Sequence, residues 1–382
     1  MLGAELSRGT IDLGTVYSLD RRTAFRQRLR EAEETGADIS PAFKNWIADV
    51  STYFHSVKRF LDSEESALWN LDQWSRERAI REYIHEAAPT IIDRLSQYSL
   101  SLGHLVGGLS QDDHQRYQSY YRRHLCKFYH YSPLLRRTYE TPLGYAGDYE
   151  MMNMLYRDHA EGESLFGKIV NMYACQEPAA AANVNRLEFF GRKIVERLHS
   201  SAGGPLQIAS IGCGPAREIQ LLLERAPELG PRLDIALIDQ EEAAITYCEH
   251  VLGPLANQTG ARVRFIRESI RTLLTARRLS DALGPRDFIY SAGLFDYLGD
   301  RSFAALLETL LGALTPKGEL FVGNVNVTNT SRWSMEYGAD WHLMHRTPQQ
   351  LLDFTKQLDP VPASCTIDQE PLGVNLFLHI VK

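Results

Sequence analysis

The chain has 382 residues, of which 44% are hydrophobic and 23% are charged, a composition that excludes a disordered or fibrous protein. Its net charge of −7 at neutral pH argues against general nucleic-acid binding, which requires a basic surface. The short basic run of Arg122, Arg123 and Lys127 is typical of a solvated helix face.

The N-terminal sequence MLGAELSRGTIDLG lacks the basic region and apolar core of a secretory signal. No stretch of the chain reaches the roughly eighteen apolar residues that cross a bilayer. The cysteines form no CxxC pair, and no histidine lies at metal-ligand spacing from them; they are Cys126, Cys175, Cys213, Cys248 and Cys365. We therefore expect a cytoplasmic protein with reduced thiols, no bound metal and no membrane partner.

The first half of the chain has the pattern of an all-helical domain. From about Ala24 to Leu198 the apolar residues recur at helical spacing, with little alternation typical of strands. The breaker Ser-Ala-Gly-Gly-Pro at 201–205 then interrupts the pattern. We predict a helical cap domain over residues 1–200 and a second domain over 201–382. The early helices are interpreted as a lid, a dimer arm or both, so a homodimer is one of the oligomeric states that the sequence allows.

The second half alternates short buried runs with helix-length segments. The predicted strands are Gln207–Ile211, Ile235–Ile238, Arg262–Ile266, Asp287–Ser291, Glu319–Val325, Ser364–Asp368 and Leu376–Val381. The helices between them are predicted at Glu218–Arg225, Glu241–Leu252 and Ser302–Leu314. Such alternation predicts right-handed βαβ units and a doubly wound α/β sheet. The last strand has no room for a crossover helix before it, so we expect it to be antiparallel.

A glycine turn after the first predicted strand indicates a nucleotide-like ligand. The sequence Gly212-Cys213-Gly214 follows Ile211 and opens a helix, and the next strand ends in Asp239. Glycines permit a tight turn and close approach of a ligand, and a carboxylate at this strand end can accept the hydroxyls of a ribose. Arg217 stands where a dinucleotide fingerprint has its third glycine. This disfavours NAD and fits a cofactor without phosphate, such as S-adenosylmethionine (SAM).

The glycine turn resembles motif I of class I SAM-dependent methyltransferases, and Asp239 resembles their ribose-binding acid. The resemblance implies a seven-stranded Rossmann-like domain that binds SAM through Gly212 and Gly214. It also implies that Glu268 and Ser269, which follow the third strand, line the adenine.

Further segments resemble a bacterial subgroup of that superfamily. They are Gly144–Glu150, Tyr290–Leu298, Gly323–Asn326, Asp340–Leu343 and Arg346–Pro348. This combination is similar to 3-hydroxypalmitate methyl ester synthases and to azetidine-2-carboxylate synthases, and it covers roughly residues 115–382. Asp296, within the second of these segments, joins the expected cofactor-binding residues.

The methionine end of SAM carries a sulfonium, an ammonium and a carboxylate. Aromatic faces attract such a cation, and Tyr121, Tyr145 and Tyr297 are the candidates, although a tyrosine-rich packing seam explains most tyrosines of this region. Asp148 is the candidate for the ammonium. Arg186 is the candidate for the carboxylate, with a surface position as the alternative.

Two enzymatic reactions and one binding role remain open. In the first reaction a small-molecule carboxylate or hydroxyl attacks the methyl group of SAM, and His342 is a candidate for acceptor binding or base catalysis, with structural pairing as the alternative. In the second, the amine of SAM displaces methylthioadenosine and forms azetidine-2-carboxylate. The third possibility is a SAM-fold module without activity. A tunnel to the methyl group would favour transfer, and a sealed cavity would favour cyclisation.

Overall fold

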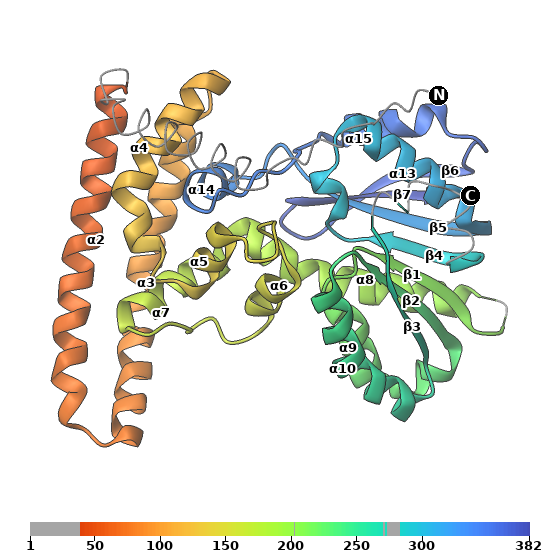
Figure 1. Ribbon diagram of the computed structural model, residues 1–382, viewed down its shortest axis with the longest axis horizontal. Helices are drawn as coiled ribbons and strands as arrows, with labels where there is room; N and C mark the ends of the chain where they lie inside the picture. Colours follow the sequence, from red (N-terminus) through yellow and green to blue (C-terminus); the bar gives the residue numbers. More distant parts are fainter. Residues whose placement is uncertain (1–38, 202, 270–271, 273–282) are drawn as a thin grey trace, which may run out of the picture.

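The computed structural model describes residues 39–201, 203–269, 272 and 283–382 (Figure 1). The predicted onset of helix at Ala24 and the N-terminal sequence lie outside the described residues. None of the helices within the described ranges has the length and apolar character needed to span a membrane.

The helical part begins with two long helices that run beside each other, α2 (Pro41–Ala67) and α3 (Gln73–Val106), joined through the short η2 (Leu68–Asn70) (Figure 1). The helices that follow are α4 (Gln111–Tyr129), α5 (Pro133–Glu140), α6 (Tyr149–Tyr156), α7 (Leu165–Gln176) and α8 (Pro178–Ser200). Most begin at a Ser or Asp whose side chain accepts a backbone N–H, as Ser110 does for α4. The predicted helical character of this region is confirmed.

Seven strands form one mixed sheet in the order β3-β2-β1-β4-β5-β7-β6. They are β1 (Leu206–Ile211), β2 (Leu233–Asp239), β3 (Arg262–Arg267), β4 (Arg286–Ser291), β5 (Leu314–Val325), β6 (Ser364–Gln369) and β7 (Asn375–Val381). Strands β1 to β5 pair in parallel, and β7 is antiparallel to both of its neighbours. The predicted doubly wound α/β fold and the antiparallel last strand are therefore confirmed.

Helices cover both faces of the sheet. One face packs on α8, α9 (Arg217–Arg225) and α10 (Glu242–Thr259), with η3 (Pro227–Arg232) beside them. The other face packs on α13 (Asp300–Ala313) and α15 (Pro348–Asp353), which η5 (Phe354–Gln357) follows. Apolar side chains alternate between the two faces along each strand, as the pleat requires.

Helix α8 bears on the predicted domain boundary. Phe189, Phe190 and Ile194 of this helix belong to the same core as the sheet strands β1, β2 and β4. The division at 201–205 remains a prediction, and this packing favours placing α8 with the α/β part, because these three side chains are buried in the core of the sheet, while α8 also contacts α6 and α7.

Helix α14 (Arg332–Gly338) connects the two parts of the molecule. It lies on the chain between β5 and β6, yet it contacts α3 and α4 of the helical part (Figure 1). Its Tyr337 is fully buried in the helical core, and its Trp333 packs against that core.

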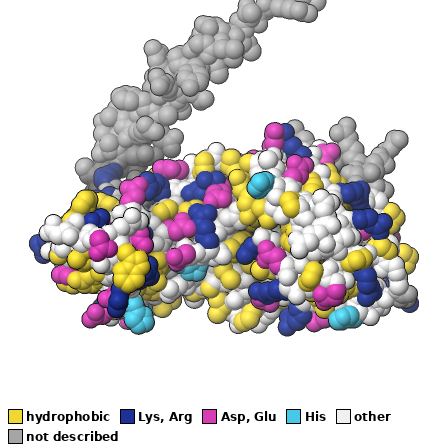
Figure 2. Space-filling model, turned by 90° about the horizontal axis from the view of Figure 1, so that it is seen from below, with side chains coloured by type: hydrophobic (Ala, Val, Ile, Leu, Met, Phe, Trp, Pro, Cys, Tyr) yellow, Lys and Arg dark blue, Asp and Glu magenta, His cyan; other side chains and the backbone are white. Residues whose placement is uncertain are grey.

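On the face seen in Figure 2, Lys and Arg side chains are interspersed with Asp and Glu side chains.

Candidate active site

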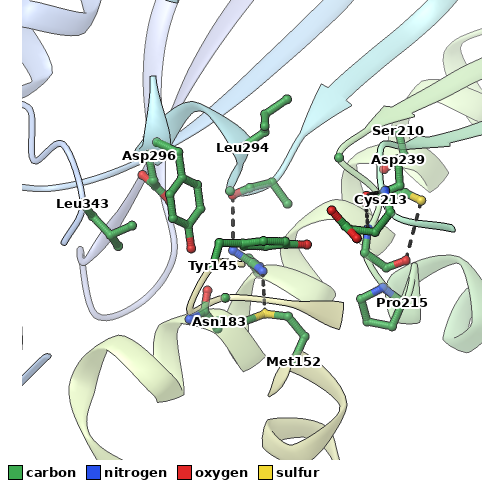
Figure 3. Close-up of a pocket in the computed structure, with 18 of the residues that line it drawn as sticks. Tyr145, Met152, Asn183, Ser210, Cys213, Pro215, Asp239, Leu294, Asp296 and Leu343 are labelled. Carbon is green, nitrogen blue, oxygen red and sulfur yellow. Dashed lines mark hydrogen bonds between the residues drawn. The ribbon is translucent and has the colours of Figure 1, made fainter. Parts of the chain in front are cut away.

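A cavity of about 340 Å³ lies at the carboxyl ends of β1, β2, β4 and β5. The strand order reverses between β1 and β4, which is where open α/β sheets bind their ligands. The loop Leu143–Gly147 and the helix α8 close the cavity from the helical side. Figure 3 shows Tyr145 between two groups of lining residues, with Asp239 and Cys213 on one side and Asp296 and Leu343 on the other.

The first end of the cavity is built around the glycine turn. Gly212 and Gly214 have positive φ angles of 65° and 52°, which favour glycine. A Cβ at Gly214 would meet no atom within 4 Å, so a ligand can approach this backbone closely. The Asp239 carboxylate accepts the Gly214 N–H at 2.9 Å and the Glu241 N–H at 3.0 Å. Its burial raises its pKa, and each oxygen keeps a lone pair for a further donor.

A second buried carboxylate, Glu218, lines the cavity at the start of α9. It accepts the Tyr290 hydroxyl at 2.6 Å, and its burial raises its pKa. Glu268 lines the cavity beyond β3, as predicted. Ser269 is not among the residues that line the cavity; its hydroxyl contacts the Thr272 hydroxyl at 3.0 Å and accepts the Thr272 N–H at 3.2 Å.

Two tyrosines meet over the middle of the cavity. Tyr145 comes from the loop before α6, and Tyr297 comes from η4 (Leu294–Tyr297); their ring centroids are 6.0 Å apart at 83°. The indole N–H of Trp341 donates to the Tyr297 hydroxyl at 3.0 Å. A Cβ at Gly147 would collide with the same hydroxyl, so only glycine allows this close approach. Burial raises the pKa of Tyr145 above its usual value, so its hydroxyl stays protonated, whereas Tyr297 is 39% exposed.

Arg186 of α8 and Asp296 of η4 face the same space. The guanidinium of Arg186 donates to the Ala292 carbonyl at 3.3 Å and contacts the Met152 sulfur at 3.1 Å, and it forms no ion pair with a carboxylate of the described residues. The Asp296 carboxylate accepts the Val325 N–H at 2.6 Å. Burial raises the pKa of Asp296 to about 7, against the lowering effect of this hydrogen bond and of Arg186.

The second end of the cavity is mostly apolar. Its lining comes from the ends of β5 and β7, from α14 and from the segment that follows α14. The apolar residues are Val325, Met335, Trp341, Leu343 and Val374, and two amides, Asn183 and Asn375, lie among them.

Besides Ser269, three predicted site residues lie away from the cavity lining. Tyr121 is buried in the helical core, stacked between Trp46 and Tyr129 at 6.1 and 6.0 Å, because α4 turns it toward α2 rather than toward the sheet. It lines a smaller pocket of about 60 Å³ that shares Ala179, Met335 and Trp341 with this cavity, and its predicted role stays a prediction. Asp148 and His342 are likewise absent from the cavity lining, and their predicted roles stay predictions.

Asp148 is the N-cap of α6 and accepts the Met151 N–H at 2.8 Å. Its buried carboxylate also forms an ion pair at 2.9 Å with the partly exposed Arg137. His342 lies between two cavity residues, Trp341 and Leu343, but its own ring is exposed and contacts Asp340 at 3.0 Å. The structural pairing that the sequence left open as the alternative for His342 is the arrangement that the structure shows.

The sequence reasoning missed Glu218, Asn183, Asn375 and Trp341 as cavity residues. Glu218 had a usable signal, because it opens the helix directly behind the glycine turn. Trp341 stands in one of the resembling segments but was assigned no role. The two asparagines carry no signal in the sequence, since they come from α8 and β7, which are almost 200 residues apart along the chain.

No protein-family model matches the chain, and no curated protein sequence matches it. Among solved structures, a possible exported protein from Bordetella parapertussis is similar over 78% of this chain and 97% of its own, with 18% identity and a TM-score of 0.49. The 1,6-didemethyltoxoflavin-N1-methyltransferase of Burkholderia thailandensis, with bound S-adenosylhomocysteine, is similar over 50% of this chain and 77% of its own, with 19% identity and a TM-score of 0.35.

A third similar structure is the magnesium protoporphyrin IX methyltransferase of Synechocystis PCC 6803. It is similar over 65% of this chain and 98% of its own, with 12% identity and a TM-score of 0.41. Likenesses at these levels carry no argument about the function of this chain, which therefore has to come from the site itself.

Proposed function

We propose that this protein is a SAM-dependent methyltransferase that acts on a carboxylate or hydroxyl of a small molecule. The observation that carries the proposal is the composition of one cavity. A carboxylate beside a glycine turn lies at one end, and an arginine without a carboxylate partner among the described residues lies toward the middle. These groups complement the ribose hydroxyls and the methionine carboxylate of SAM.

The residues present fit this cofactor. Asp239 would accept the ribose hydroxyls, because each of its oxygens has a lone pair beyond its backbone donor. Arg186 would bind the carboxylate through its planar guanidinium, whose present neighbours are a carbonyl and a thioether. The faces of Tyr145 and Tyr297 would attract the sulfonium. When bound, SAM supplies an electrophilic methyl group.

The protein then has to align an acceptor and, where the acceptor is a hydroxyl, to remove its proton. Asp296 is the group for this task, because its pKa near 7 places it between its two protonation states at neutral pH. A carboxylate acceptor would need no base. The contact of Tyr297 with Trp341 and Gly147 forms one side of the cavity.

Binding measurements test the proposal first. Isothermal titration calorimetry with SAM and S-adenosylhomocysteine should show binding to the wild type, and Asp239→Ala and Arg186→Gln should each weaken it by about tenfold or more, because each removes charge-assisted hydrogen bonds. Arg192→Gln is the matched control, since Arg192 lies on the same helix with an exposed side chain. If the wild type bound neither SAM nor S-adenosylhomocysteine, the proposal would be contradicted.

Product analysis separates the two reactions. We would incubate the protein with SAM alone, and with SAM plus hydroxylated fatty acids or small carboxylates, and identify products by mass spectrometry. S-adenosylhomocysteine together with a methylated acceptor, lost in Tyr145→Ala, supports methyl transfer. If SAM alone gave methylthioadenosine and an azetidine amino acid, the reaction would be cyclisation and the methyl-transfer proposal would be overturned.

A further inference from the structure

Two buried amides at the apolar end of the cavity have no assigned role. Asn375, the first residue of β7, is 6% exposed, and its Nδ2 is buried without a hydrogen-bond partner among the described residues. Asn183, on α8, is 9% exposed, and its side chain likewise forms no hydrogen bond within the described part of the chain. Both residues line the cavity, and Figure 3 shows Asn183 directed into it.

An unsatisfied buried donor is costly, because the group has lost its hydrogen bonds to water and gained none in return. Most buried polar atoms in folded proteins have a partner for this reason. An exception that lines a cavity beside a cofactor-sized space is explained most directly by a ligand that supplies the missing partner. The donor on Asn375 is an N–H, so the partner must be an oxygen with a free lone pair.

The backbone around Asn375 is held firmly in place. Glu370, which is 1% exposed, accepts the N–H groups of Asn375 at 3.2 Å and Val374 at 2.7 Å and the side chain of Asn185 at 2.9 Å. The side chain of Asn326 donates to the Gly373 carbonyl at 3.0 Å. These contacts fix the start of β7 before any ligand arrives, which is the arrangement expected of a preorganised binding group.

The surroundings narrow the class of ligand. Val325, Met335, Leu343 and Val374 present an apolar wall around the amides. This wall disfavours an ammonium or another strongly hydrated cation. A ligand with a carbon chain or ring would pack against the apolar wall, and its carbonyl or carboxylate oxygen would accept hydrogen bonds from the amide donors.

We propose that Asn375, with Asn183, binds an oxygen of the methyl acceptor and so selects an acceptor with a carbonyl or carboxylate group on an apolar body. This inference rests on the proposed function, because it assigns the second end of the same cavity. It names Asn375 as the residue that orients the acceptor.

The experiment compares stability with ligand binding. Asn375→Leu has nearly the same shape and removes the unpaired donor, so the midpoint of thermal unfolding should stay or rise. Asn326→Leu is the matched control: it is also a buried amide, but it loses a formed hydrogen bond, so its midpoint should fall. A fall for Asn375→Leu as large as that of the control would show a structural role and overturn the proposal.

Ligand binding is measured by saturation-transfer NMR with hexanamide as the probe and hexylamine as its comparison, both with and without S-adenosylhomocysteine. The wild type should bind hexanamide and not hexylamine, and Asn375→Leu should weaken hexanamide binding at least about fivefold. Equal binding by wild type and variant, or a preference for hexylamine, would overturn the inference. If the wild type did not bind S-adenosylhomocysteine, this would instead count against the proposed function. The two failures can be told apart because hexanamide binding is also measured without S-adenosylhomocysteine.

Discussion

At the residue scale, Asp296 is the clearest case of a side chain whose chemistry is set by the fold. It is 7% exposed at the centre of the cavity, and burial raises its pKa to about 7 although Val325 donates a hydrogen bond to it. Arg186 and Arg346 lower the pKa by less than burial raises it. A carboxyl group in this position changes charge near neutral pH, which an exposed aspartate does not do.

This shift predicts a pH dependence of stability. The folded state binds a proton at Asp296 more tightly than the unfolded state does, so this group lowers the free energy of unfolding as the pH rises from about 4 to about 7. Asp296→Asn should flatten that decline. Urea unfolding of the variant and wild type at several pH values measures it, with Glu308→Gln on the exposed side of α13 as control. An unchanged decline in Asp296→Asn would contradict the assignment.

Single residues also show where sequence reasoning succeeds and where it stops. Asp239 was predicted because its position after a buried strand and beside the glycine turn follows from the order of elements alone. Tyr121 and Asp148 do not line the cavity and their predicted roles stay predictions, since the sequence does not say which neighbour a side chain meets in space. Asn375 could not be predicted, since an unpaired donor is visible only when every possible partner has been placed.

At the element scale, the strands were predicted well because short apolar runs between breakers are a strong local signal. Strand β5 is longer than predicted, since its first residue, Leu314, pairs with Arg286 before a register shift. The role of α14 was not predicted. Nothing in its seven residues indicates that a segment between two strands returns to pack on the helical part.

The turn after α14 depends on a contact from α4. Asp340 has a φ angle of 53°, in the left-handed region that favours glycine, and the next residue is the cavity residue Trp341. The Arg122 guanidinium donates to the Asp340 carboxylate at 2.6 Å and to the carbonyls of Glu336 at 2.8 Å and Tyr337 at 3.1 Å. Arg122 thus stabilises a strained turn that directs Trp341 toward Tyr297.

Arg122→Gln should therefore loosen the wall of the cavity without touching its cofactor end. We expect the free energy of unfolding to fall by about 1–2 kcal/mol, because the charged hydrogen bonds are partly exposed. Acrylamide should also quench the fluorescence of Trp341 more strongly than in the wild type. The contribution of Trp341 is identified as the part of the signal that is lost in Trp341→Phe. Affinity for S-adenosylhomocysteine should change less than about threefold. Lys127→Gln, on the exposed side of α4, is the control. A fluorescence signal identical to that of the wild type would refute this coupling.

At the scale of the whole molecule, the helical and α/β parts share structure rather than merely touching. Tyr337 belongs to the chain segment between two strands, yet it completes the core of the helical part and bonds to His114 at 2.9 Å. Phe190 of α8, the helix that links the two parts along the chain, is buried against the sheet and stacks on Tyr290 with ring centroids 4.7 Å apart. The helical part therefore has no complete core without α14, which belongs to the chain of the α/β part.

This exchange predicts that the described helical and α/β parts unfold together. In urea, far-UV circular dichroism and tryptophan fluorescence should report one coincident transition, and S-adenosylhomocysteine should shift both signals equally. Tyr337→Ala should cost about 3–5 kcal/mol and separate the signals, because it removes a buried ring from the shared core. Tyr139→Ala, which truncates a partly exposed tyrosine, should keep them coincident. Two separate transitions in the wild type would mean that α14 is a surface contact and that the cap and the sheet are independent domains.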